Sequence, residues 1–97
     1  MKNYIPIVDY IRSSAIDKGH AIIGRKIGDV FGITNADVRR FVNEARRNGV
    51  PICSCASGYY YSYNSEDIDR TIKHLRGRIS KVECAIAGLS GVKTRAF

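Results

Sequence analysis

The side chains best suited to chemistry in this chain are arginines and asparagines that cluster in one short segment. In chain order the cluster contains Asn35, Arg39, Arg40, Asn43, Arg46 and Arg47. A guanidinium group forms bidentate hydrogen bonds with guanine edges or phosphates, and a carboxamide does the same with adenine. The cluster is therefore suited to binding an anionic polymer.

The net charge points to the same class of ligand. Sixteen Lys and Arg residues against nine Asp and Glu residues give a formal charge of +7. A small basic protein is attracted to nucleic acid or to an anionic membrane surface. Residues 1–64 carry nine basic and five acidic groups, +4, and residues 65–97 carry seven and four, +3. Net charge also serves solubility, so charge alone does not decide between these roles.

Catalysis and metal binding find little support in the residue pattern. Cys53 and Cys55 have Cys-x-Cys spacing, whereas structural zinc sites commonly use Cys-x-x-Cys pairs and four ligands. Cys84, His20 and His74 are the remaining candidate ligands of these types. No Ser, Cys or pair of carboxylates stands at a spacing that implies a catalytic site. The chain also has no Gly-Lys-Ser/Thr phosphate-binding loop. We expect free thiols, no metal, no cofactor and no enzymatic activity.

Membrane and secretion signals are not evident either. The apolar stretches are far shorter than the ~20 residues that span a bilayer. The first residues lack the continuous apolar region of a signal peptide. An odd number of cysteines, three, fits a reducing compartment. We expect a cytoplasmic protein without a membrane partner.

The length of 97 residues allows one structural domain. Apolar periodicity and capping residues predict an α+β fold that is mainly α. We expect a helix from Pro6 to about Lys18, a short strand over 21–23, helices over 25–31 and 35–48, hairpin strands over 50–55 and 59–63, and a long helix from 65 to about Leu89. These elements divide into a unit over 1–64, a C-terminal helix over 65–90 and a flexible tail over 91–97.

The helix over 35–48 has the clearest local signals. Thr34 precedes it and Asp37 follows three residues later, which is the spacing of a capping box. Gly32 allows a tight turn from the preceding helix. The inward faces are expected to comprise Ile27, Val30 and Phe31 on the preceding helix and Val38, Phe41, Val42 and Ala45 on this one.

Segments on both sides of this helix are distinctive. They are Phe31-Gly32-Ile33-Thr34, Arg46-Arg47-Asn48-Gly49-Val50-Pro51-Ile52 and Gly58-Tyr59. With them the chain from Ile23 to Tyr61 resembles the winged helix-turn-helix family, most closely the DNA-binding module of biotin-repressor-type regulators and small phage and bacterial winged-helix proteins. The resemblance implies three helices with a hairpin wing, and a recognition helix over 35–48 that enters the major groove. It stops near Tyr63, so only the DNA-binding module is implied.

The outer face of the expected recognition helix supplies most of the expected DNA contacts. Base edges are assigned to Asn35, Arg39, Arg40 and Asn43, with Ala36 beside them, and phosphates to Arg46 and Arg47. Arg25, Lys26, Thr34 and, at the hairpin tip, Ser57 complete the expected interface. The alternative is that these side chains form only a solvent-exposed helix face and contact no DNA. Tyrosines at 59, 60, 61 and 63 suit base stacking or core packing, and strand alternation favours core packing.

The C-terminal helix carries a seven-residue apolar repeat. Its members are Ile68, Ile72, Leu75, Ile79, Val82, Ile86 and Leu89. The two apolar positions of such a seven-residue repeat are called a and d. β-Branched residues at position a with leucine at position d favour a parallel two-stranded coiled coil. The beginning of the stripe can pack on the chain's own domain, but so small a domain cannot cover all of it. We expect a homodimer with contacts at Leu75, Ile79, Val82, Ile86 and Leu89.

These patterns favour a dimeric, sequence-specific binder of double-stranded DNA, most simply a prokaryotic or phage regulator of transcription. An origin-binding or replication accessory protein is the alternative within the same binding class. A winged-helix adaptor that binds a host enzyme through the apolar C-terminal stripe is the alternative from another class.

Overall fold

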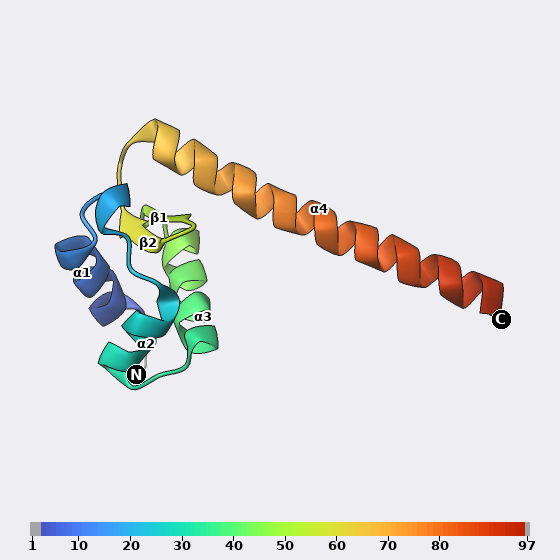
Figure 1. Ribbon diagram of the computed structural model, residues 1–97, viewed down its shortest axis with the longest axis horizontal. Helices are drawn as coiled ribbons and strands as arrows, with labels where there is room; N and C mark the ends of the chain where they lie inside the picture. Colours follow the sequence, from blue (N-terminus) through green and yellow to red (C-terminus); the bar gives the residue numbers. More distant parts are fainter. Residues whose placement is uncertain (1–2, 97) are drawn as a thin grey trace.

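The computed structural model describes residues 3–96 and is mainly helical, with a small β-hairpin and a long C-terminal helix (Figure 1). Its elements are α1 (Ile5–Ser14), a 3₁₀ turn η1 (Lys18–His20), α2 (Gly24–Phe31), α3 (Asn35–Arg47), β1 (Ile52–Cys55), β2 (Gly58–Tyr61) and α4 (Ser65–Ala96). The predicted class, α+β and mainly α, is confirmed. Across residues 3–96, none of the helices combines the length and the apolar character that a bilayer span needs.

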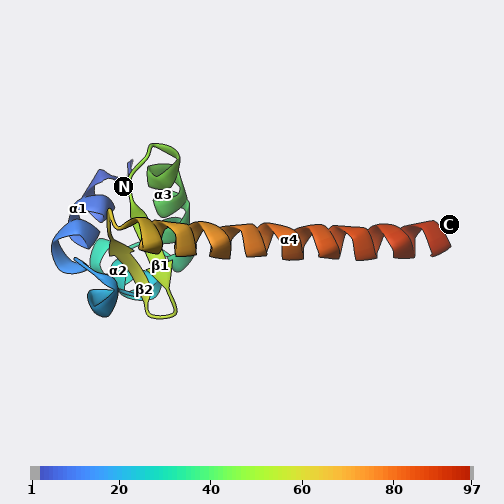
Figure 2. The same cartoon turned by 90° about the horizontal axis from the view of Figure 1, so that it is seen from above.

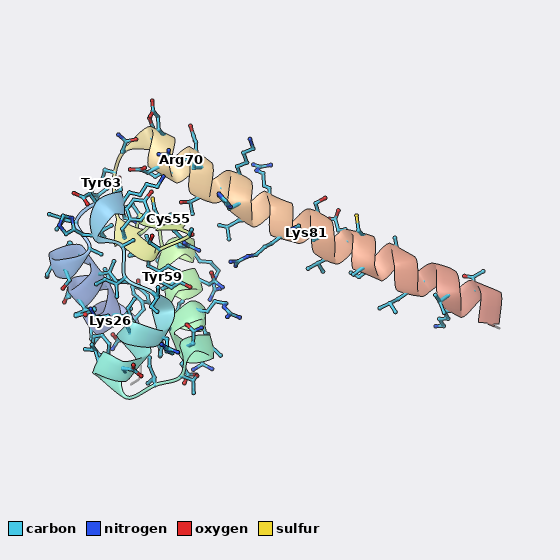
Figure 3. The ribbon with its side chains drawn as sticks, in the orientation of Figure 1. Lys26, Cys55, Tyr59, Tyr63, Arg70 and Lys81 are labelled. Atoms are coloured by element: carbon cyan, nitrogen blue, oxygen red, sulfur yellow. The ribbon has the colours of Figure 1, made fainter. Side chains whose placement is uncertain are left out.

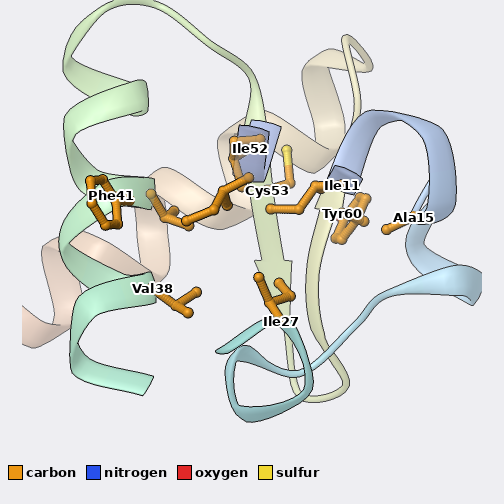
Figure 4. Close-up of a cluster of buried hydrophobic side chains, with 10 residues drawn as sticks. Ile11, Ala15, Ile27, Val38, Phe41, Ile52, Cys53 and Tyr60 are labelled. Carbon is orange, nitrogen blue, oxygen red and sulfur yellow. The ribbon is translucent and has the colours of Figure 1, made fainter. Parts of the chain in front are cut away.

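The hydrophobic core lies between the first three helices and the hairpin (Figure 4). It consists of Ile7, Ile11, Ala15, Ile27, Val38, Phe41, Val42, Ile52, Cys53 and Tyr60. The inward face predicted for α3 is confirmed, because its four apolar residues, Ala45 included, are all buried. Burial of one large aliphatic side chain contributes about 1.5–3 kcal/mol. This face therefore holds α3 in one rotational setting about its axis.

A tight turn joins α2 to α3. Gly32 ends α2 with a φ of +67°, a left-handed conformation that glycine adopts without strain. The predicted capping box at the start of α3 is confirmed: the Asp37 N–H donates to Thr34 Oγ1 at 3.0 Å, and the Thr34 N–H donates to Asp37 Oδ2 at 3.3 Å. Turn and cap together fix where α3 begins relative to α2.

The hairpin pairs β1 with β2 in antiparallel register, from Ile52 opposite Tyr61 to Cys55 opposite Gly58. Ala56 and Ser57 make the connection, so Gly58 lies in the strand and not in the turn where we expected it. The short strand expected over 21–23 is a single bridge, in which the backbones of Ile22 and Tyr59 exchange hydrogen bonds of 2.9 and 2.8 Å.

The tyrosines of the hairpin divide between core and surface. Tyr60 is 1% exposed and belongs to the core, whereas Tyr63 is 77% exposed. Tyr59 and Tyr61 are half-buried. Core packing is therefore confirmed for Tyr60, and its burial, together with a hydrogen bond to Asp67, raises the pKa of its phenol to about 12.

Helix α4 begins on the hairpin and then leaves it (Figure 2). Asn64 caps its N-terminal end, because Asn64 Oδ1 accepts the N–H groups of Glu66 at 2.9 Å and Asp67 at 3.2 Å. The first turns pack against β1, with Thr71 buried and Leu75 half-buried. From residue 76 to residue 94 every side chain is exposed.

Three further predicted boundaries or orientations were wrong. Helix α1 ends at Ser14 and not near Lys18, because Asp17 Oδ1 accepts the His20 N–H and starts the separate turn η1. Val30 is 53% exposed, because Gly24, Ile27 and Gly28 form the buried face of α2 and Val30 lies off it. Helix α4 continues to Ala96, because a single glycine such as Gly91 costs only about 1 kcal/mol and no proline follows it. The tail expected over 91–97 is thus helical to Ala96, and Phe97 lies outside the described residues.

Gly58 provides a direct test of the hairpin geometry. Its φ is +124°, and a Cβ there would overlap the backbone carbonyl of Ile22. We expect Gly58→Ala to lower the free energy of unfolding by about 1–3 kcal/mol from backbone strain alone, measured by urea denaturation. The control Gly19→Ala places a Cβ in ordinary contact with Asp17, 3.4 Å away, and should change stability by less than about 0.5 kcal/mol. Equal stabilities of the two variants would contradict the close approach of β2 to Ile22.

Candidate nucleic-acid interface

The outer face of α3 is mainly polar because Val38, Phe41, Val42 and Ala45 all lie on the opposite side. Ala36, Arg39, Arg40 and Arg47 are exposed, and Asn43 is half-buried. Core residues at spacings of three and four leave the intervening positions directed away from the domain. Most of the expected DNA-contacting side chains of α3 are therefore available to a ligand.

The exposed arginines of α3 differ in how they are held. Arg40 Nη2 lies 2.9 Å from Asp37 Oδ1 in an exposed ion pair, and such pairs contribute little to stability. The pKa of Asp37 is lowered chiefly by its hydrogen bonds with Thr34 and further by Arg40. Among residues 3–96, Arg39 and Arg47 take part in none of the ion pairs. Their guanidinium groups can thus meet a ligand without first breaking one.

Arg46 makes hydrogen bonds within the protein, and the phosphate contact that we expected of it stays a prediction. Its Nε donates to the Ile52 carbonyl at 2.8 Å, and its Nη2 donates to Ser54 Oγ at 3.2 Å. Its guanidinium carbon lies 5.8 Å from the ring centroid of Tyr59. The side chain is partly buried, and this burial lowers the pKa of the guanidinium. Arg46 therefore ties the C-terminal end of α3 to the hairpin.

A continuous set of hydrogen bonds extends this connection to α4. The Ser54 hydroxyl oxygen accepts the hydrogen bond from Arg46, and the Ser54 backbone N–H donates to Thr71 Oγ1 at 3.2 Å. The Thr71 hydroxyl in turn donates to the Asp67 carbonyl at 3.0 Å. Helix α3, strand β1 and helix α4 are thus joined through polar groups as well as through apolar packing.

The remaining expected contacts lie around the N-terminal end of α3 and at the hairpin tip. Thr34 uses its hydroxyl oxygen to cap α3. The Asn35 carboxamide oxygen sits so close to Gly24 that a Cβ at Gly24 would overlap it. Arg25 and Lys26 are exposed in the first turn of α2, and Ser57 is exposed at the tip.

A concave surface of about 640 Å³ brings three elements together (Figure 3). We call it the basic groove, and its polar and aromatic lining comprises Asn35, Arg39, Asn43 and Arg46 of α3, Ser54, Cys55 and Tyr59 of the hairpin, and His74, Arg78 and Lys81 of α4. None of its described lining residues is Asp or Glu. The expected contacts that do not line it are Arg25, Lys26, Thr34, Ala36, Arg40, Arg47 and Ser57. The groove thus unites only part of the expected interface.

The contribution of α4 to the groove was not predicted from the sequence. A spacing of four and three residues places His74, Arg78 and Lys81 on one face of a helix, and this signal was available. The direction in which α4 leaves the hairpin decides whether that face meets α3, and this direction depends on tertiary contacts such as Thr71 with Ser54.

The cysteines form no cluster of ligands. Cys53 is buried, Cys55 is half-buried and Cys84 is exposed, and all three are free thiols. Burial raises the pKa of the Cys53 thiol. Over the part of the chain that the structure describes, no three His, Cys, Asp or Glu residues are grouped closely enough to hold a metal ion.

Comparison with protein-family models, with curated proteins and with solved structures gives no match to this chain. Any assignment of function must therefore rest on the arrangement of the residues themselves.

The internal role of Arg46 can be separated from a surface role by comparison with its neighbour. Arg46→Ala removes two charge-assisted hydrogen bonds, and we expect it to lower the free energy of unfolding by about 1.5–3 kcal/mol. Arg47→Ala removes an exposed side chain and should change stability by less than about 0.5 kcal/mol. Urea denaturation of both variants measures the difference. Equal urea midpoints would show that Arg46 does not hold the hairpin.

Proposed function

We propose that this chain is a winged helix-turn-helix protein that binds double-stranded DNA. Helices α2 and α3 with the Gly32 turn between them correspond to the helix-turn-helix, and β1 and β2 correspond to the wing. The bridge from Ile22 to β2 ties the segment before α2 to this hairpin. The arrangement supports the expected family resemblance at the level of element order and pairing.

One observation carries the proposal: α3 has its whole apolar face in the core and an arginine- and asparagine-rich face outside. A helix can enter the major groove only when its outer side chains are polar and reach base edges. Arg39 and Asn43, which also line the basic groove, suit guanine and adenine edges respectively. Arg47 suits a phosphate, and Arg46 acts by positioning the hairpin.

The biological role that fits these features best is that of a prokaryotic or phage regulator of transcription, which acts in the cytoplasm by occupying a site on DNA. Binding at a replication origin would use the same surface. An adaptor that binds a protein through the apolar stripe would not need the polar face of α3, and salt dependence distinguishes the two classes of ligand.

The experiment measures binding of the full chain to a mixed-sequence duplex as a function of salt. Each phosphate contact contributes about 0.9 to the slope of log K against log salt. Arg47→Ala should therefore reduce this slope by about 1 per protomer. The matched control, Lys73→Ala, removes one exposed charge of α4 that lies off the apolar stripe and outside the basic groove, and it should leave the slope unchanged. Failure of the unmodified chain to bind duplex DNA at low salt would overturn the proposal.

We also propose that two copies pair through α4. Beyond the domain, Ile79, Val82 and Ile86 are each 58% exposed and Leu89 is 72% exposed, although all four continue one apolar stripe. The exposed part of this stripe, from Ile79 to Leu89, is about 15 Å long at 1.5 Å per residue. A heptad stripe of this length is self-complementary, and a second copy covers it. Leu75 is half-buried on the domain side, so the pairing surface begins after it.

Pairing can be tested by placing charges on and off the stripe. Ile79→Asp/Val82→Asp should convert a dimer into a folded monomer, because two unpaired carboxylates would be buried in each half of the seam. Sedimentation equilibrium measures the mass. Ser80→Asp/Cys84→Asp adds the same charge at exposed positions off the stripe and should remain dimeric. If Ile79→Asp/Val82→Asp still sediments as a dimer, the apolar stripe of α4 is not the surface through which two copies pair.

A further inference from the structure

Helix α4 has a second functional face besides its apolar stripe. His74, Arg78 and Lys81 follow one another at spacings of four and three residues and line the basic groove together with α3. Ile79 and Val82, which belong to the stripe, do not line it. At 100° per residue the basic face is centred roughly a third of a turn from the stripe. A ligand in the groove and a second copy on the stripe can therefore be accommodated at the same time.

The charge of the groove is unbalanced. Arg39 and Arg46 on one wall oppose Arg78 and Lys81 on the other, and no carboxylate belongs to the described lining. The carboxylates of α4, at residues 66, 67, 69 and 83, all lie outside the groove. Like charges placed together on a concave surface concentrate a positive potential there, which attracts a polyanion. None of these four cations takes part in an ion pair within residues 3–96.

The α4 wall lies beside α3, where a duplex entered by α3 would present its phosphates. When a helix lies in the major groove, the two phosphate strands run along the rims of that groove, which is about 12 Å wide. A basic wall beside the DNA-facing helix therefore meets the phosphates of one rim. In Figure 3 the wall formed by α4 is marked by Lys81, and the hairpin side of the groove is marked by Tyr59 and Cys55.

We propose that Arg78 and Lys81 bind backbone phosphates of the same duplex that α3 contacts, so that the base of α4 is part of the DNA-binding site. This inference rests on the proposed function of α3. It assigns α4 two roles on two faces, phosphate binding near the domain and pairing along the stripe. The fixed departure of α4 from the hairpin, through Thr71 and Ser54, places the phosphate contacts before DNA arrives.

The test compares two double variants of the full chain that lose the same charge from the same helix. Arg78→Ala/Lys81→Ala removes the α4 wall of the groove. Lys73→Ala/Arg76→Ala removes two exposed cations that do not line it. Binding to a mixed-sequence duplex is measured against salt concentration. The first variant should lose about 2 from the slope per protomer, and the second should keep the slope of the unmodified chain.

The outcomes separate this inference from the proposed function. Equal losses in both double variants would show a diffuse effect of charge and overturn the inference. If Arg78→Ala/Lys81→Ala binds like the unmodified chain while Arg47→Ala has a reduced slope, α3 remains the DNA-binding helix and α4 is excluded from the DNA-binding site. Absence of duplex binding by the unmodified chain would overturn both. Equal sedimentation of both variants and the unmodified chain confirms that pairing is unaffected.

Discussion

Burial of one face of α3 is the constraint on which the rest of this structure depends. Val38, Phe41, Val42 and Ala45 are held between α1, α2 and the hairpin, and they leave the helix one rotational setting. Rotation by one residue, about 100°, would bury charged side chains at a cost that such a small core cannot offset. The polar outer face is thus a direct consequence of packing, and the orientation of Arg39 and Asn43 follows from it.

Polar contacts fix the positions of the hairpin and α4 relative to α3. Arg46 holds the hairpin, Ser54 links it to Thr71, and α4 leaves the domain in the direction that these contacts require. The same residues explain why the proposed interface is larger than one helix. Contacts formed among α3, the hairpin and α4 before binding reduce the entropy that would be lost in ordering them on DNA.

Local signals in the sequence were sufficient for some features and insufficient for others. The cap at Thr34, the turn at Gly32 and the core face of α3 depend on residues within one or two helical turns, and all were predicted correctly. The internal role of Arg46 and the approach of Gly58 to Ile22 depend on segments distant in sequence, which periodicity does not reveal. The basic face of α4 was visible as a spacing, but its position beside α3 is a property of the folded chain. The length of α4 was underestimated because residues 91–97 show no apolar pattern, yet the helix continues through them to Ala96.

The most direct measurement of the central claim is selection of bound sequences from a pool of random duplex DNA by the unmodified chain. The proposed roles of Arg39 and Asn43 predict enrichment of a short motif containing guanine and adenine, and pairing through α4 predicts that the motif recurs with two-fold symmetry. Recovery of the starting pool without enrichment, under salt conditions in which the duplex is retained, would contradict base reading by α3.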